Sequence, residues 1–128
     1  MRIDPWVGTQ FADYNKLLEE FGIEKFDGSK LPNPQRMFRR GVVFGQRGFD
    51  LIQGAIDGKK PFAVLTGLMP SGNMHLGHKM VLDQANYFHS LGADLFICVA
   101  DIEAYATRNT PLEKGRTIAV EEYIKSYI

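Results

Sequence analysis

The chain has 128 residues, of which 45% are hydrophobic, with 15 Lys and Arg balanced by 15 Asp and Glu. This length suits one ordinary domain or a portion of a larger one. The formal net charge of zero gives no reason to expect nucleic-acid or membrane binding through bulk charge. A single cysteine excludes a disulfide framework and fits a reducing, cytoplasmic setting, and no apolar stretch is long enough to span a bilayer.

The first part of the chain predicts short elements separated by Gly and Pro. Apolar spacing from Phe11 to Phe21 indicates one face of a helix, which Thr9 could cap and Gly22 end. The β-favouring run at 42–44 lies between two glycines and indicates a strand in a hairpin or bulge. In chain order, we expect an extended segment at 1–6, a helix at 11–21, a loop at 26–34, a strand at 42–44 and a short helix at 49–56.

The stretch from Pro61 to Asp101 predicts a βαβ unit. An apolar run at 62–65 is followed by a helical period from His75 to Phe88, which Leu91-Gly92 ends, and by a second apolar run at 95–100. The second run is typical of a buried strand, in which we expect Cys98 to be part of the core. In such units ligands bind beyond the carboxyl ends of the strands, here at 66–78.

The last part predicts a polar loop at 102–110 and then a helix, with Pro111 in its first turn, that continues to Ile128. The fold class is therefore α/β with a parallel sheet. The unit supplies two clear parallel strands, fewer than such a sheet normally has, and the final helix lacks a capping residue. We expect the front portion of a larger α/β domain.

The residue pattern with most chemical content is His75 and His78, which share a face at the first turn of the predicted helix. Free backbone N–H groups and the positive end of the helix dipole make this end an anion site. Two imidazoles there can donate hydrogen bonds to phosphate oxygens whose charge grows in a transition state. Gly77 lets a flat ring approach the backbone, and a turn at 70–73 adds the Ser71 hydroxyl. The pattern suggests a nucleoside triphosphate attacked at its α-phosphate.

Other readings of these residues remain open on the pattern alone. A His-x-x-His pair is more often a surface or metal-binding feature, although the position of Cys98 in a presumed strand gives zinc little support, and we expect no metal ligands. The Gly-Lys-Ser/Thr of a P-loop is absent. Asp101 and Glu103 could hold an ammonium group or a ribose, or belong to a solvated loop. The side chains of Arg39 and Arg40 could reach phosphates, or the two residues could belong to an exposed strand edge.

Several segments resemble one enzyme family. The sequence PSGNMHLGH at 70–78 is similar to the first signature of class I aminoacyl-tRNA synthetases, His-Ile-Gly-His, with Leu for Ile. ADIEAY at 100–105 resembles the segment after the second strand in the tyrosyl and tryptophanyl subgroup. Archaeal and eukaryotic-type tryptophanyl enzymes have an N-terminal extension, absent from tyrosyl enzymes, that is similar to DPW at 4–6, DYNKL at 13–17 and FRRGVVF at 38–44.

The resemblance implies a Rossmann-like catalytic domain that activates tryptophan with ATP and Mg²⁺ and transfers it to the tRNA for tryptophan, usually as a homodimer. It divides the chain into an extension at 1–58, whose hairpin covers ATP, and the first part of the catalytic domain at 59–128. By the family's pattern, His75 and His78 are catalytic and stabilise the α-phosphate. The ATP site would also include Ser71, Gly72, Gly77, Arg39 and Arg40, and the amino-acid site would include Leu65, Gly67, Cys98 and Glu103.

The chain departs from the family's pattern in two ways. Eukaryotic-type enzymes have Tyr in place of Leu65 and Gln in place of Cys98, so another residue must accept the indole N–H here. The later lysine-rich signature and the helical anticodon-binding domain are absent, so we expect these residues alone to be inactive. A tyrosyl-tRNA synthetase and a catalytically silent nucleotide-binding module of the same fold remain the alternatives.

Overall fold

A computed structural model describes residues 14–127, without the side chains of Tyr14, Asn15 and Leu17. The chain divides into two compact units, Met1–Gln53 and Gly54–Ile128. The expected extended segment at 1–6 and the expected cap at Thr9 lie outside the described residues.

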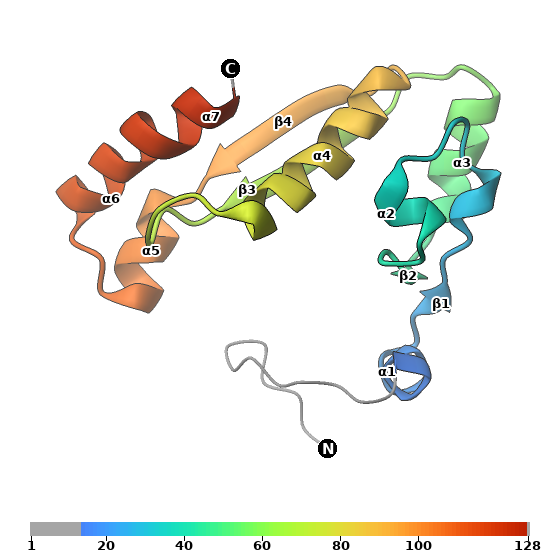
Figure 1. Ribbon diagram of the computed structural model, residues 1–128, viewed down its shortest axis with the longest axis horizontal. Helices are drawn as coiled ribbons and strands as arrows, with labels where there is room; N and C mark the ends of the chain where they lie inside the picture. The colour runs from blue at the N-terminus through green and yellow to red at the C-terminus, as the bar shows by residue number, and fades with distance from the viewer. Residues whose placement is uncertain (1–13, 128) are drawn as a thin grey trace. The chain divides into compact units, whose positions relative to one another are not determined.

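The first unit contains short elements around a two-stranded antiparallel pairing (Figure 1). Glu24 pairs with Gln46, and Lys25 with Gly45. The predicted helix at 11–21 is confirmed over the described residues, and so is the short helix at 49–56, whose last turn extends into the second unit. The elements are α1 (Tyr14–Phe21), β1 (Glu24–Lys25), the 3₁₀ helix η1 (Gly28–Lys30), α2 (Arg36–Arg39), β2 (Gly45–Gln46) and α3 (Phe49–Asp57).

An aromatic cluster forms the core of the first unit. Phe26 and Phe38 are buried, with ring centroids 5.7 Å apart, and Phe49 meets Phe26 edge-on at 5.1 Å. A Cβ atom on Gly28 would lie 2.9 Å from the Cβ of Phe38, so only glycine lets η1 approach α2 this closely. Three aromatic side chains thus hold η1, α2 and α3 together.

The predicted strand at 42–44 is wrong. Met37 and its neighbours form α2, and the chain then turns, with the Val42 N–H donating to the Met37 carbonyl at 3.0 Å. The strand begins later, at Gly45, where β1 offers a partner. Val43 and Phe44 are half-buried and the Phe44 carbonyl accepts the Phe26 N–H at 2.9 Å, but the two residues of β1 pair only with Gly45 and Gln46, so the run before them has no strand partner.

The second unit is built on the predicted βαβ arrangement, which is confirmed: β3 (Ala63–Leu68), α4 (Leu76–Ser90) and β4 (Asp94–Val99). β3 and β4 are parallel neighbours, paired from Ala63 with Asp94 to Leu68 with Val99, and α4 lies across one face of the pair (Figure 1). The helix ends at the predicted Leu91-Gly92. Gly92 has a φ of 101°, a conformation that favours glycine, and its N–H donates to the His89 carbonyl at 2.9 Å.

Exposure alternates along both strands. The face toward α4 is half-buried and carries Val64, Thr66, Leu95 and Ile97. The other face is open: the exposed fraction of Leu65 is 76% and that of its register partner Phe96 is 58%. The expectation of a buried second strand is therefore half wrong, because within residues 14–127 only one face of β4 is covered by a helix.

After β4 the chain forms helices where a polar loop was predicted at 102–110, so that prediction is wrong. Asp101 and Glu103, whose polarity suggested a loop, lie in the first turn of a helix. Their negative charges are favourable there because they lie near the positive end of the helix dipole. The buried Ala104 faces inward, and Asn109 ends the helix with a φ of 51°. The elements are α5 (Asp101–Arg108), α6 (Leu112–Ile118), the π-helix η2 (Ala119–Ile124) and α7 (Lys125–Tyr127).

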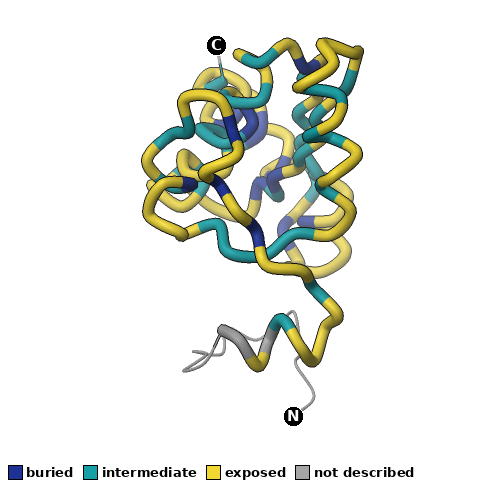
Figure 2. Tube along the Cα trace, turned by 90° about the vertical axis from the view of Figure 1, so that its right-hand side faces the viewer, coloured by how far each residue is buried: buried dark blue, intermediate teal, exposed yellow. Residues whose placement is uncertain are grey.

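Small side chains dominate the buried positions of the second unit, which Figure 2 marks in dark blue along the chain. Alanines are the buried residues of α4 and α5, and η2 contributes the buried Ala119 and the large buried side chain of Tyr123. The predicted helix from 112 is confirmed to residue 127, with a π-turn inside it that no sequence signal indicated. Among residues 14–127 the structure contains no helix of the length and apolarity that a bilayer crossing requires.

Candidate functional site

Two histidines cap the start of α4. His75 is the N-cap, in extended conformation, and its Nδ1 accepts a hydrogen bond from the Gly77 N–H at 3.1 Å. His78 reaches back, and its Nδ1 accepts from the His75 N–H at 3.2 Å. The two side chains thus satisfy backbone donors reciprocally, as Ser and Glu do in an ordinary capping box. The His78 and Lys79 N–H groups donate to the His75 carbonyl at 3.0 and 3.3 Å, so among the described residues the Leu76 N–H is the one in this turn left without a partner, at the positive end of the helix dipole.

Gly77 is required by the position of the His75 ring. A Cβ atom at this position would lie 2.9 Å from Cε1 and 3.0 Å from Nδ1 of His75. Any other residue would push the imidazole off the helix end. The glycine therefore has a role toward a protein side chain, in addition to the ligand approach for which the sequence suggested it.

The hydrogen bonds assign the neutral tautomers of both imidazoles. Because each Nδ1 accepts a hydrogen bond, the hydrogen of each neutral ring is on Nε2. The ring centroids are 3.9 Å apart. Burial, and secondly the nearby charge of His75, lower the pKa of His78, which favours its neutral form. His75 is exposed, and among residues 14–127 its Nε2 has no hydrogen-bond partner.

The loop between β3 and α4 is tightly turned, as predicted. The Ser71 N–H donates to the Met69 carbonyl at 2.8 Å, and Pro70 is fully buried. Ser71 and Gly72 are exposed, beside the start of the helix in sequence. The carboxyl end of β3, this loop and the two histidines thus follow one another along the chain, at the edge of the sheet where parallel α/β folds bind ligands.

Tyr123 also belongs to this site, although sequence reasoning gave it no role. Its Oη donates to the Met69 carbonyl at 3.1 Å and lies 3.4 Å from Nε2 of His78. The two rings meet edge to face, with centroids 5.4 Å apart. The only sequence signal was the apolar spacing of the last helix, which marked Tyr123 as an inward-facing residue.

Of the four residues predicted for the amino-acid site, the three on the strands share the open face of the β3–β4 pair. Gly67 is the register partner of Cys98, and a Cβ atom on Gly67 would have ordinary contact with the Cys98 carbonyl at 3.6 Å. Leu65 lies two residues earlier on the same face. Cys98 is exposed, so its expected place in the core is wrong; the side chain points to the face that α4 does not cover.

Two carboxylates follow β4 in the first turn of α5. Asp101 is engaged: its Oδ1 accepts the Ile102 N–H at 2.8 Å, and its Oδ2 lies 3.5 Å from Nε of Arg116. Glu103 is exposed. Of the two, Glu103 is thus the one whose position leaves its carboxylate accessible to a ligand amino group.

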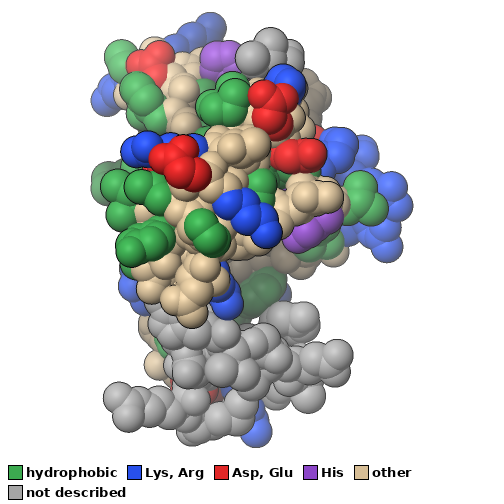
Figure 3. Space-filling model, turned by 90° about the vertical axis from the view of Figure 1, so that its left-hand side faces the viewer, with side chains coloured by type: hydrophobic (Ala, Val, Ile, Leu, Met, Phe, Trp, Pro, Cys, Tyr) green, Lys and Arg blue, Asp and Glu red, His purple; other side chains and the backbone are tan. Residues whose placement is uncertain are grey.

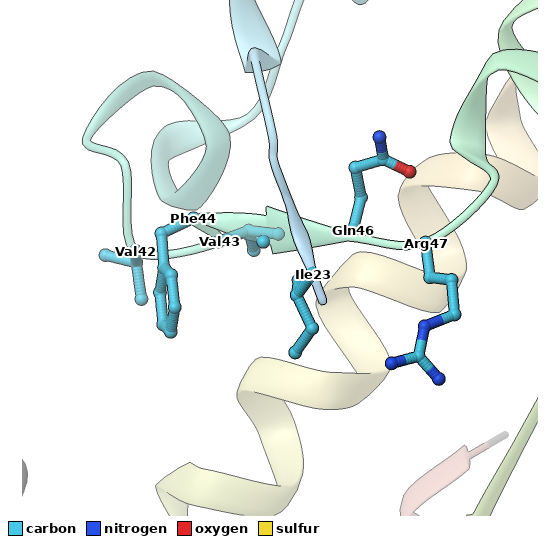
Figure 4. A pocket seen from close by; sticks show the side chains of 7 residues that line it. Ile23, Val42, Val43, Phe44, Gln46 and Arg47 are labelled. Atoms are coloured by element: carbon cyan, nitrogen blue, oxygen red, sulfur yellow. The ribbon is translucent and has the colours of Figure 1, made fainter. Parts of the chain in front are cut away.

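Arg39 and Arg40 end α2 in the first unit, and both are exposed. Arg39 is the last residue of the helix and Arg40 its C-cap, so the pair does not form the strand edge that the sequence suggested as an alternative. Their predicted contact with ATP stays a prediction. The same unit has an apolar groove beside β2 (Figure 4), lined by Ile23, Val42, Val43, Phe44, Gly45, Gln46 and Arg47.

Charge and metal-ligand patterns are unremarkable elsewhere. Acidic and basic side chains both occur on the face seen in Figure 3. Within the described part of the chain, no three His, Cys, Asp or Glu residues are grouped as metal ligands require. His89, at the other end of α4, is engaged with the Ala93 carbonyl at 2.9 Å.

Comparison with known proteins decides the family. Residues 57–128 match the family described as tRNA synthetases class I (W and Y). The chain belongs to this family. The matched region begins at the end of α3 and contains the βαβ unit, both capping histidines and all the helices after β4.

Relatives extend the similarity over nearly the whole chain. The tryptophan–tRNA ligase of Thermoplasma volcanium is 51% identical over 98% of this chain and 29% of its own length. That of Methanocaldococcus jannaschii is 39% identical over 100% of this chain and 35% of its own length. This synthetase chain therefore spans about a third of the length of these relatives.

Solved structures give the same fold. The tryptophanyl-tRNA synthetase of Aeropyrum pernix has a TM-score of 0.78 at 42% identity, over 98% of this chain and 36% of that one. A tryptophanyl-tRNA synthetase from Encephalitozoon cuniculi, solved bound to tryptophan, has a TM-score of 0.77 at 30% identity, over 87% of this chain and 34% of that one. The Rossmann-like α/β fold class predicted from the sequence is confirmed.

Proposed function

We propose that this chain is the amino-terminal portion of the catalytic region of a tryptophan–tRNA ligase. In the full-length protein, it activates tryptophan with ATP and transfers the aminoacyl group to the tRNA for tryptophan. The observation that carries the proposal is the pair of imidazoles at the first turn of α4, beyond the carboxyl end of β3, in a chain of this family. The names of the relatives support tryptophan as the amino acid.

The proposed chemistry uses the helix start as an oxyanion site. The tryptophan carboxylate attacks the α-phosphorus, a new O–P bond forms, and the bond to the β-phosphate bridging oxygen breaks, releasing pyrophosphate. Negative charge on the α-phosphate oxygens grows during this step. His75 stabilises that charge together with the positive end of the helix dipole, and His78 holds the backbone of His75 in place. The exposed Nε2–H of His75 is oriented outward for such a contact.

The remaining site residues follow from their places around the carboxyl end of the sheet. Gly67, Leu65 and Cys98 border the tryptophan side chain on the open face of the two strands. Glu103 meets the ammonium group from the first turn of α5. Ser71, Gly72 and Gly77 face the nucleotide. The assignment of Arg39 and Arg40 to its phosphates rests on the family resemblance of the first unit and not on a place around the sheet.

Mg²⁺ would accompany the triphosphate, neutralising charge on the departing pyrophosphate. The described residues offer no cluster of carboxylates to hold it, so the fit is to an ion whose ligands are mainly the phosphate oxygens. The other expected properties of the full-length protein, tRNA binding, a homodimeric state and a cytoplasmic location, are part of the same proposal.

The test is amino-acid-dependent exchange of pyrophosphate into ATP by the full-length protein. We expect exchange with tryptophan and a kcat/KM at least about 100-fold lower with tyrosine. A preference for tyrosine would identify a tyrosyl enzyme, which the family description, covering both amino acids, makes the second candidate. Nucleotide binding without exchange for either amino acid would identify a silent module and overturn the proposal.

A further inference from the structure

Tyr123 connects the last helix of the described chain with the histidine cap of α4. Its exposed fraction is 1%, and its ring stands edge to face against the His78 ring. The Oη atom lies within hydrogen-bond distance of two groups: the Met69 carbonyl at 3.1 Å and Nε2 of His78 at 3.4 Å. A buried hydroxyl held this way contributes a defined hydrogen-bond direction as well as packing.

The direction of each hydrogen bond in this group follows from what each atom can donate. The Met69 carbonyl can only accept, so Tyr123 donates its hydrogen there. The lone pairs of the Tyr123 oxygen then face Nε2 of His78, which must be the protonated nitrogen. Independently, the His75 N–H donates to Nδ1 of His78 and requires that nitrogen to be bare. Both ends of the ring thus select the same tautomer.

Because both nitrogens of His78 have partners within the chain, His78 has no free N–H to offer a ligand. His75 differs: its Nδ1 caps the helix, while its Nε2–H has no partner among the described residues. The two histidines of the motif are therefore not equivalent. One is fixed on the protein by hydrogen bonds at both nitrogens, and the other is held at one nitrogen and open at the other.

We propose that Tyr123 is a positioning residue that fixes the Nε2–H tautomer and the ring orientation of His78, which in turn holds His75 as the imidazole that donates to the substrate phosphate. This rests on the proposed function for its substrate, but the hydrogen-bond arrangement does not depend on it. Tyr123 acts through His78, and His78 acts through the backbone N–H of His75 and through the stacked rings, whose centroids are 3.9 Å apart.

The π-helix η2 is consistent with such a role. Tyr123 lies inside its single wide turn, between the α-helical segments α6 and α7. Wide turns of this kind are rare, appear mostly as single turns inside α-helices and are frequent at functional sites. Here the wide turn carries the large buried side chain that contacts Met69 and His78.

The experiment compares Tyr123→Phe with Tyr127→Phe in the full-length protein labelled with ¹⁵N at histidine. Tyr127 is the matched control, one turn later, because its buried Oη has no hydrogen-bond partner among the described residues. The ¹⁵N shifts of His78, assigned by loss of signal in His78→Gln, report which nitrogen is protonated. Rapid-quench measurement of adenylate formation, at saturating ATP and tryptophan, reports the rate.

In the wild type and in Tyr127→Phe we expect protonated Nε2 and bare Nδ1 at His78. In Tyr123→Phe the His75 N–H alone still selects the tautomer, so we expect both nitrogen shifts to move part of the way toward averaged values. The rate of adenylate formation should fall about tenfold, with the KM for tryptophan unchanged within about twofold. Loss of position, not of substrate binding, is the signature expected of a residue that acts through another.

Three results would overturn the proposal: a wild-type His78 protonated on Nδ1, unchanged His78 shifts in Tyr123→Phe, or an unchanged rate. If Tyr123→Phe does not fold, the wild-type tautomer alone still decides the hydrogen-bond arrangement. A protein that activates neither tryptophan nor tyrosine refutes the proposed function, and the NMR result then stands by itself as a test of how His78 is held.

Discussion

The two faces of the β3–β4 pair differ in burial: one packs against α4, and the other is exposed. On the face toward α4, Val64, Thr66, Leu95 and Ile97 are half-buried. On the other face, Leu65, Gly67, Phe96 and Cys98 are exposed, and this is the face to which the proposed function assigns tryptophan. Side chains alternate along a strand, so adjacent residues in sequence can serve stability and binding separately.

The start of α4 shows the same separation within one helical turn. His78 is half-buried and bonded at both nitrogens, while His75 is exposed and bonded at one. Inward-facing groups should therefore affect folding, and outward-facing groups should affect activity with little effect on folding. This contrast can be tested by substitutions on each side.

The largest effect should come from His75→Ala in the full-length protein. Losing the outward-facing donor should lower the rate of adenylate formation about 100- to 1,000-fold, because the α-phosphate charge loses a preorganised partner. The dissociation constant for tryptophan should change less than about twofold, since the ring does not contact the amino acid in the proposed arrangement. Pre-steady-state kinetics and equilibrium binding measure the two quantities.

The matched control is His89→Ala, the same change at the other end of the same helix, where the imidazole is engaged with the Ala93 carbonyl. Its rate of adenylate formation should stay within about twofold of the wild type. Equal losses of rate and tryptophan binding in His75→Ala would contradict the outward-facing role.

Gly77→Ala should lower activity less than His75→Ala does, and it should leave the stability of the fold nearly unchanged. The added methyl would lie about 3 Å from the His75 ring and displace it, so activity should fall about 10- to 100-fold. Alanine favours a helix over glycine by up to about 1 kcal/mol, but displacing the His75 ring also removes a cap worth about 1 kcal/mol, so the free energy of unfolding should change little. Pyrophosphate exchange and thermal denaturation measure the two.

Gly54→Ala is the comparison for this prediction, because Gly54 lies in α3 and a Cβ atom there would have open space. It should gain stability and keep full activity. A Gly77→Ala protein as active as Gly54→Ala would show that the His75 ring does not need its present position.

The two strand faces can be compared directly with Ile97→Ala and Phe96→Ala in the 128-residue chain. Ile97 faces α4, so its truncation should lower the free energy of unfolding by about 1–3 kcal/mol. Phe96 is 58% exposed, so its truncation should cost less than about 1 kcal/mol although more atoms are removed. Urea denaturation checks both values, and a larger loss for Phe96→Ala would contradict the open face.

The smallest effect concerns pH and His78. Its pKa is lowered from the usual 6.5, first by burial and then by His75, so protonation favours the unfolded chain. The corresponding stability is complete above about pH 6.5 and is lost as the pH falls through the lower pKa of the folded state. His78→Gln should therefore show a weaker decrease in unfolding free energy than the wild type between about pH 7 and pH 5. Parallel curves would show that His78 is protonated equally in both states.

Local patterns in the sequence were enough to predict the βαβ unit and the helix start that holds the two histidines. The apolar period and Gly92 defined α4, the two apolar runs defined β3 and β4, and the motif at 70–78 located the histidines at a helix start. Family resemblance added the class of enzyme, which the comparisons confirmed. These features depend on backbone propensity, periodicity and a short motif, all readable along the chain.

Strand pairing, the burial of particular residues and the contact of Tyr123 with His78 were decided only by the tertiary structure, because each needs a partner distant in sequence. The run at 42–44 was not a strand because β1 pairs further along, at Gly45 and Gln46. The polar segment after β4 became α5 because Ala104 could be buried. Cys98 was placed on the uncovered face, and Tyr123 came to His78 across 45 residues of chain. Pairing, burial and long-range hydrogen bonds arise only when separate segments meet, so no local pattern could carry them.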